Sequence, residues 1–263
     1  MNNNNNNNEI RSFEKEMLDV TRRFDLVDIF SDFLEIMICC LSAGEQEEHY
    51  FKIIKKYEKQ ELYNFQRAVA ALINESDNRG EGLKDVLGTF FTIHVTRGHN
   101  GQYFTPPEIC KLMAAIVSKS SPIYSELISD PACGSGTTLL AREEQRRLDG
   151  GSKDFYFGTD IDRRCAMMAA INLCINGMFG EISWMDTLSQ QFFGAWTIQP
   201  HPKNGAPYIR KITEEESSVK LKLPKQKEKE TINRIPEVVL QQIEQELPLE
   251  VLKKVEAVQQ TLF

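Results

Sequence analysis

The stretch ISDPACGSGTTLLA, residues 128–141, decides the fold of this chain. A short apolar segment leads into Asp130, a tight turn with Gly134 and Gly136 follows, and TTLLAREEQRR has the pattern of a helix. In an open α/β sheet, ligands bind beyond the carboxyl ends of the strands, where glycines let the backbone come close and the next helix presents its amides. The stretch therefore predicts a ligand site at the end of a strand.

The spacing of the glycines argues against a phosphate ligand. No GK[ST] follows the turn to grip a phosphate, and the pattern is not GxGxxG. Glycine-rich turns also serve simply to reverse the chain. The turn alone therefore does not identify a ligand.

Two further acids follow apparent strands. Asp160 ends FYFGTD, and Asp186 follows ISWM. Dinucleotide folds use an acid about 20 residues or more after the turn to hold the ribose, although Asp160 or Asp162 can equally serve as a helix N-cap. Acids at three successive strand ends, with Asp130 first, indicate an adenosyl amino acid rather than a phosphate cofactor.

The pattern around this stretch predicts the fold class and the domain boundaries. Helical and strand patterns alternate over residues 99–210, which predicts an α/β domain with an open parallel sheet whose strands end near 129, 159 and 185. Apolar residues spaced by three and four over residues 9–98 predict a helical N-terminal region. Residues 1–8 are poly-Asn and expected to be disordered, and residues 211–263 are expected to form a charged linker and a short C-terminal helix.

Composition bounds the class of protein. The chain has 263 residues, 41% of them hydrophobic and 26% charged, which is ordinary for a soluble globular protein. A net charge of -7 excludes a uniformly basic coat but not a local basic patch. Six cysteines without zinc spacing predict buried free thiols and no metal, and the most apolar run is interrupted by Asp28, Asp32 and Glu35. We therefore expect a cytoplasmic protein with no membrane segment.

Four segments in order resemble the signatures of the adenine-specific DNA methyltransferases, especially the modification subunits of type I restriction systems. They are GQYFTPPEICKLMAAIV, DPACGSGTTLLA, GTDIDRRCAMMAAINLCINGM and DTL. The resemblance implies a Rossmann-like fold, S-adenosylmethionine as cofactor, DNA as substrate, a specificity or restriction subunit as partner, and a restriction-modification system or mobile element as the setting.

The same resemblance implies roles for ten residues. Tyr103, Phe104, Thr105 and Pro106 would line the cofactor pocket, although core packing is the alternative for the two aromatic rings. The methionine part would be held by Asp130, Ala132, Gly134 and Gly136, the ribose by Asp160, and the adenine amino group by Asp186.

The sequence departs from this family at the acceptor motif. The amino group of adenine is a poor nucleophile, and the family polarises it with [DNS]PP[YFW] after a fourth strand. This chain has no such motif. GAPY at residues 205–208 resembles it only loosely, because it lacks the polar acceptor residue. We expect no apolar strand before it and a surface-loop position for Tyr208, with Asn204 and Tyr208 the residues to test. Two hypotheses stay open: an adenine-specific DNA methyltransferase-like protein, and a catalytically silent pseudo-methylase that acts as a binding or regulatory module.

Overall fold

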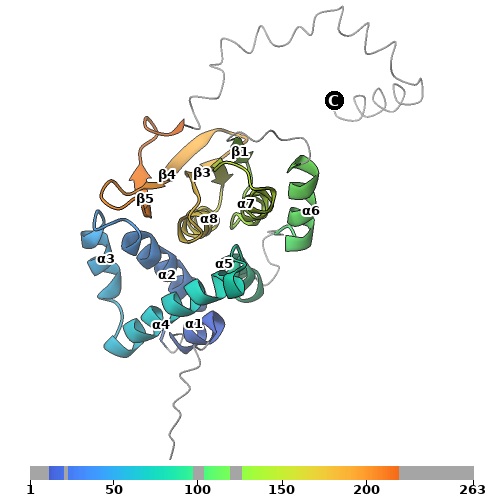
Figure 1. Ribbon diagram of the computed structural model, residues 1–263. Coiled ribbons are helices and arrows are strands. Elements are labelled where there is room, and N and C mark those ends of the chain that lie inside the picture. Colours follow the sequence, from blue (N-terminus) through green and yellow to red (C-terminus); the bar gives the residue numbers. More distant parts are fainter. Residues whose placement is uncertain (1–11, 21–22, 97–103, 119–125, 219–263) are drawn as a thin grey trace, which may run out of the picture. The chain divides into compact units, whose positions relative to one another are not determined.

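The computed structural model describes residues 12–20, 23–96, 104–118 and 126–218 (Figure 1). All of them belong to one compact unit, Met1–Val219. In these ranges, no helix combines the length and the apolar character that crossing a membrane requires.

A five-stranded mixed sheet forms the framework, with the strand order β1-β2-β3-β4-β5. The first three strands are parallel and the last two are antiparallel to their neighbours. The strands are β1 (Leu127–Asp130), β2 (Phe155–Asp160), β3 (Phe179–Asp186), β4 (Gln191–Pro200) and β5 (Pro207–Ile212). The α/β class and the three strand ends near residues 129, 159 and 185 are confirmed.

The hairpin of β4 and β5 corrects three expectations. The sheet is not wholly parallel, an apolar strand does precede GAPY, and the strand β5 runs through Ile212, beyond the expected linker boundary at residue 211. Pro200 and Pro207 pair next to the loop that joins the two strands, at the end of β4 and the start of β5, where a strand tolerates residues without an amide donor. Tyr208 is only 8% exposed, and its hydroxyl accepts a hydrogen bond from Gln199 Nε2 (2.6 Å), so it does not lie in a surface loop.

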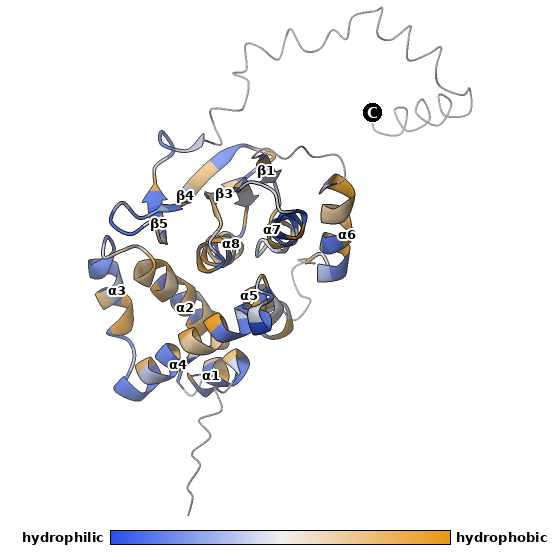
Figure 2. Cartoon of the chain, in the orientation of Figure 1, coloured by the Kyte–Doolittle hydropathy of each residue, from blue (hydrophilic) through white to orange (hydrophobic). Residues whose placement is uncertain are grey.

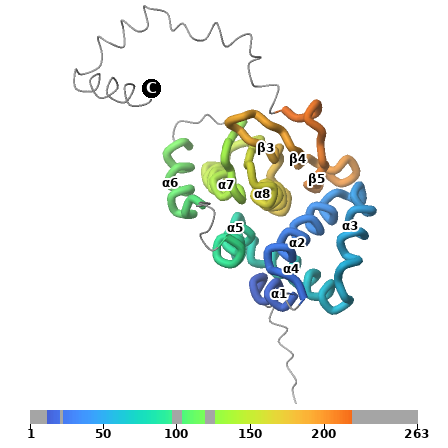
Figure 3. Tube along the Cα trace, turned by 180° about the vertical axis from the view of Figure 1, so that it is seen from behind, coloured from blue at the N-terminus to red at the C-terminus, as the bar shows by residue number. Residues whose placement is uncertain are grey.

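Three helices follow the predicted pattern around the sheet: α6 (Pro107–Ser118), α7 (Thr137–Asp149) and α8 (Arg163–Ile175). Every residue from Cys165 to Cys174 in α8 is buried. Figures 1 and 3 agree in placing α8 between the sheet and the N-terminal helices, so this helix is covered from both sides. The run AMMAAINLC suits that position because it carries no charge on any face.

The helical N-terminal region is confirmed, with more breaks than its apolar spacing predicts. It comprises α1 (Phe13–Val20), α2 (Leu26–Cys40), α3 (Glu47–Ile54), α4 (Lys59–Ser76), the 3₁₀ turn Asn78–Gly80, α5 (Val86–Phe90) and the π-helical turn Phe91–Thr96. The apolar spacing over residues 47–76 is divided between two helices, α3 and α4. Glu58 starts the second with a capping box to Glu61, which satisfies the free amides at that end.

One hydrophobic core joins these helices to the sheet. Phe33 of α2 contacts Phe13 of α1, with ring centroids 5.4 Å apart, and the same core extends through α8 to Ile182 and Ile198 in the sheet. Figure 2 shows α2 mostly in hydrophobic colours. The helical and α/β parts proposed as domains therefore share their buried surface.

Candidate functional site

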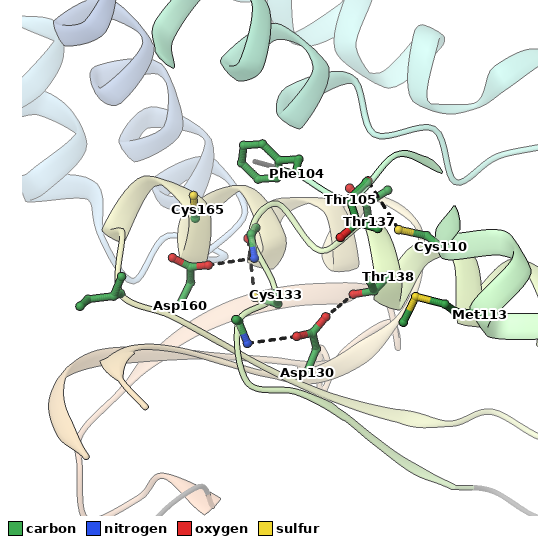
Figure 4. A pocket seen from close by; sticks show the side chains of 13 residues that line it. Phe104, Thr105, Cys110, Met113, Asp130, Cys133, Thr137, Thr138, Asp160 and Cys165 are labelled. Atoms are coloured by element: carbon green, nitrogen blue, oxygen red, sulfur yellow. Dashed lines mark hydrogen bonds between the residues drawn. The ribbon is translucent and has the colours of Figure 1, made fainter. Parts of the chain in front are cut away.

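A pocket of about 450 Å³ lies at the carboxyl ends of β1 and β2 (Figure 4). Six of the ten predicted site residues line it: Phe104, Thr105, Asp130, Ala132, Gly134 and Asp160. Tyr103 lies outside the described residues. The other lining residues are Cys110, Met113, Cys133, Thr137, Thr138, Ile161 and Cys165.

Residues 131–136, which we call the pocket turn, form one wall. Gly134 has φ +55°, and its amide donates a hydrogen bond to Asp160 Oδ2 (2.9 Å). A Cβ at Gly134 would lie 2.6 Å from Cε1 of Phe104, closer than any real contact. Because both the φ angle and the missing space favour glycine, a side chain here would displace the Phe104 ring or the turn.

Asp160 faces the pocket from the end of β2. Its carboxylate accepts hydrogen bonds from the amides of Gly134 (2.9 Å) and Asp162 (2.8 Å). Burial raises its pKa above the ordinary value of 3.8, and the charges of Asp162 and Asp130 act in the same direction, whereas the two amides lower it. Asp162, not Asp160, caps α8 by accepting from the amide of Arg164 (2.8 Å). The N-cap alternative for Asp160 is therefore not what the structure shows.

Asp130 ends β1 and braces the pocket turn against α7. Its carboxylate accepts from the amide of Ala132 (3.0 Å) and from the hydroxyl of Thr138. Figure 4 shows both carboxylates, Asp130 and Asp160, beside the turn. Two acids from adjacent strands thus lie next to one cavity.

Three predicted residues do not line this pocket. Gly136 is the N-cap of α7, and a Cβ there would lie 3.4 Å from Ala169 of α8, so its small size allows close helix packing. The carbonyl oxygen of Pro106 accepts from the amide of Cys110 (3.1 Å) at the start of α6. Asp186 accepts from the amides of its own turn, which with the Ser189 side chain lower its pKa.

Sequence reasoning missed the thiols and the apolar residues of the lining. Burial raises the pKa of Cys133 and Cys165, so both stay neutral thiols in the pocket wall. Of the six cysteines, all free, only Cys40 is exposed, which corrects the expectation that all are buried. Ile161 is the one of these residues with a usable sequence signal, because this apolar residue stands between two acids in TDID; in the structure it is 63% exposed.

The lining selects against anionic ligands. None of its thirteen residues, all within the described part of the chain, is Lys or Arg, while two are carboxylates. No group of three or more His, Cys, Asp or Glu side chains among the described residues has the geometry to hold a metal ion. The arrangement suits a ligand with hydroxyl or ammonium donors and an apolar portion.

Comparisons with known proteins give a family match and a few similar proteins. The N-6 DNA methylase family matches residues 85–220. Two proteins of Methanocaldococcus jannaschii are similar over short segments. The type I restriction enzyme MjaVIII methylase subunit is 34% identical over 104 residues, 37% of this chain and 17% of the relative. The MjaVII methylase subunit is 29% identical over 83 residues, 31% of this chain and 14% of the relative.

The matched part of this chain spans less than a fifth of the length of these two relatives. Among solved structures, a putative class I S-adenosylmethionine-dependent methyltransferase from Listeria monocytogenes is similar at 14% identity with a TM-score of 0.40. That likeness covers 64% of this chain and 51% of the other.

Proposed function

The chain belongs to the N-6 DNA methylase family, and we propose on this premise that it binds S-adenosylmethionine in the pocket at the ends of β1 and β2 and takes part in methylation of adenine in DNA. S-adenosylmethionine is the cofactor of the family. One observation carries the proposal: two carboxylates, Asp130 and Asp160, meet the pocket turn at one cavity that no Lys or Arg lines.

The pocket residues fit this cofactor in size and chemistry. The volume of about 450 Å³ is within the range of small-molecule sites. When bound, S-adenosylmethionine supplies a methyl group on a positively charged sulfur. We propose that Asp160 accepts hydrogen bonds from the ribose hydroxyls, and that Asp130, Ala132 and Gly134 lie beside the methionine part. We leave Pro106, Gly136 and Asp186 out of these contacts, because none of the three lines the pocket.

The residues that would polarise the adenine amino group have less support in this chain than the cofactor pocket has. The 263 residues of the chain contain no [DNS]PP[YFW], and Tyr208, the aromatic residue of GAPY, is buried and hydrogen-bonded to Gln199. The Asn204 side chain accepts from the amide of Ala206 (3.1 Å) in its own turn. These observations favour, as a second candidate, a module that binds the cofactor without transferring methyl by itself.

The setting follows from the curated relatives. Both are named as methylase subunits of type I restriction enzymes. We therefore propose that this chain acts on DNA within a restriction-modification system, together with a specificity subunit.

Calorimetric titration of the chain with S-adenosylmethionine tests the cofactor site. We expect binding by the wild-type chain and a roughly 10- to 100-fold weaker affinity for Asp160→Ala, because losing a charged acceptor costs about 1.5–3 kcal/mol. Asp162→Ala is the matched control, since this acid caps α8 and does not line the pocket. Equal affinity of wild type and Asp160→Ala, with the fold intact, would remove Asp160 from the site.

Incubation with tritiated S-adenosylmethionine and duplex DNA separates the two candidate functions. We expect slow or no methyl incorporation by the isolated chain, because losing preorganised hydrogen-bond partners costs about 10²–10³ in rate per group. Robust incorporation would instead show that the chain itself supplies an acceptor for the amino group, and Asn204→Ala and Tyr208→Phe would be the first variants to measure.

A further inference from the structure

A cluster of polar side chains next to the pocket turn has no part in the contacts proposed above. At its centre is Asp85, the N-cap of α5, whose Oδ1 accepts from the amide of Gly88 (2.8 Å) and from Asn172 Nδ2 (2.9 Å). Its Oδ2 accepts from the hydroxyls of Ser135 (2.5 Å) and Thr137 (2.7 Å). One carboxylate thus joins a helix of the N-terminal region to the pocket turn, to α7 and to α8.

The helix α5 lies very close to the pocket turn at Gly88. A Cβ at Gly88 would lie 2.2 Å from Asp85 Oδ2 and 2.3 Å from Ser135 Oγ, so only glycine lets α5 come this close. Ser135 is fully buried, and its carbonyl oxygen accepts from Asn172 Nδ2 (2.9 Å). The middle of the pocket turn is therefore held by side chains that lie outside the turn itself.

We propose that Asp85 is a positioning residue for the cofactor: it holds the pocket turn, through Ser135 and Thr137, in the conformation that lines the pocket. This inference rests on the proposed binding of S-adenosylmethionine. Asp85 and Ser135 do not line the cavity, whereas Cys133, Gly134 and Thr137 do.

Loss of the Asp85 carboxylate would weaken cofactor binding for an energetic reason. Removing the carboxylate leaves the buried hydroxyl of Ser135 and the half-buried hydroxyl of Thr137 without the acceptor that Asp85 provides, which favours other conformations of the turn. If only a minor fraction of molecules keeps the binding conformation, the apparent affinity falls by that fraction. A fraction of about one tenth would weaken cofactor binding about tenfold.

Hydrogen exchange of the ligand-free chain tests the inference without any cofactor. The amides of Cys133, Gly134 and Gly136 are hydrogen-bonded, so their exchange reports the state of the turn. We expect Asp85→Asn to speed exchange at these amides and to weaken S-adenosylmethionine binding about tenfold by calorimetry. Asp77→Asn is the matched control, because Asp77 also accepts from an amide three residues on, that of Gly80 (2.8 Å), and does not contact the turn.

Ser135→Ala supplies the second arm of the test. If Asp85 acts through Ser135, the double variant loses less affinity than the two single losses combined. Additive losses, or unchanged exchange of the turn in a folded Asp85→Asn chain, would overturn the inference. If Asp85→Asn does not fold, Ser135→Ala alone must speed exchange at Gly134 for the inference to stand. Failure of the wild-type chain to bind S-adenosylmethionine would refute the proposed function, while the exchange data would still decide whether Asp85 holds the turn.

Discussion

At the scale of single residues, Gly134 brings two requirements together. Its φ of +55° lies in the left-handed region, and the Phe104 ring occupies the place of a side chain. Gly205, in the hairpin loop, has a φ of +71° but nothing within 4 Å of its missing Cβ. Substitution of Gly205 therefore introduces backbone strain alone, whereas substitution of Gly134 introduces both backbone strain and a steric clash.

We predict that Gly134→Ala weakens S-adenosylmethionine binding at least tenfold, whereas Gly205→Ala leaves the affinity unchanged. Both variants pay a left-handed backbone cost of about 1 kcal/mol in stability, but only the first forces the pocket wall to move. Calorimetric titration of both variants, with urea unfolding as the measure of stability, checks this. Equal affinity of Gly134→Ala and Gly205→Ala would mean that the pocket turn accommodates a side chain at residue 134, contrary to this prediction.

At the scale of elements, a buried acid ties α7 to β2. The Glu143 carboxylate accepts from the Tyr156 hydroxyl (2.7 Å) and from the guanidinium groups of Arg146 and Arg147. Burial alone would raise the pKa of Glu143, but these hydrogen bonds outweigh it and hold the pKa below 4.5. Since the folded-state pKa is lowered, the charged form contributes stability above pH 4.5, and this contribution is lost as the pH falls through the folded-state value.

We predict that Glu143→Gln lowers the free energy of unfolding at pH 7 by about 1–3 kcal/mol, because buried donors lose a charged acceptor. The difference between wild type and variant should shrink as the pH falls below 4.5. Urea unfolding over a pH series measures both effects. Glu144→Gln is the control, since its pair with Lys111 is partly exposed and such pairs contribute about 0–1 kcal/mol. If the difference in unfolding free energy between wild type and Glu143→Gln stayed constant down to acid pH, the Glu143 charge would not be its source.

At the scale of the whole molecule, we expect the shared core to make the helices and the sheet unfold as one cooperative unit. Both tryptophans of the chain, Trp184 and Trp196, lie in the sheet, whereas most of the helical residues that the structure describes lie in the N-terminal region. Tryptophan fluorescence and far-ultraviolet circular dichroism therefore report on different parts of one fold.

We predict that both signals unfold together in urea, and that Phe33→Ala shifts both by about 3–5 kcal/mol. Phe33 is fully buried in α2, far along the chain from either tryptophan. Phe51→Ala, at a 53% exposed position of α3, should shift neither signal by much. A fluorescence transition that Phe33→Ala leaves in place would show that the sheet folds without the helices.

The sequence by itself determined the strand-turn-helix unit around DPACGSG and the positions of Asp130 and Asp160. These signals are local, because glycine conformation, helix starts and strand ends depend on neighbouring residues. The helical N-terminal region and the positions of the first three strands along the chain were predictable for the same reason. The hairpin of β4 and β5 was not, because its prolines and short apolar runs resemble a loop until the pairing with β3 is seen.

Only the tertiary structure decided which residues share the pocket and what holds its wall. Phe104 meets Gly134 across 30 positions of sequence, and Asp85 reaches Ser135 across 50. Asp186 ends its strand as Asp130 and Asp160 do, yet it does not line the pocket that those two acids share. The physical reason is that a side chain's partner depends on which distant elements pack beside it, and that packing follows from burial of the whole core rather than from any local pattern.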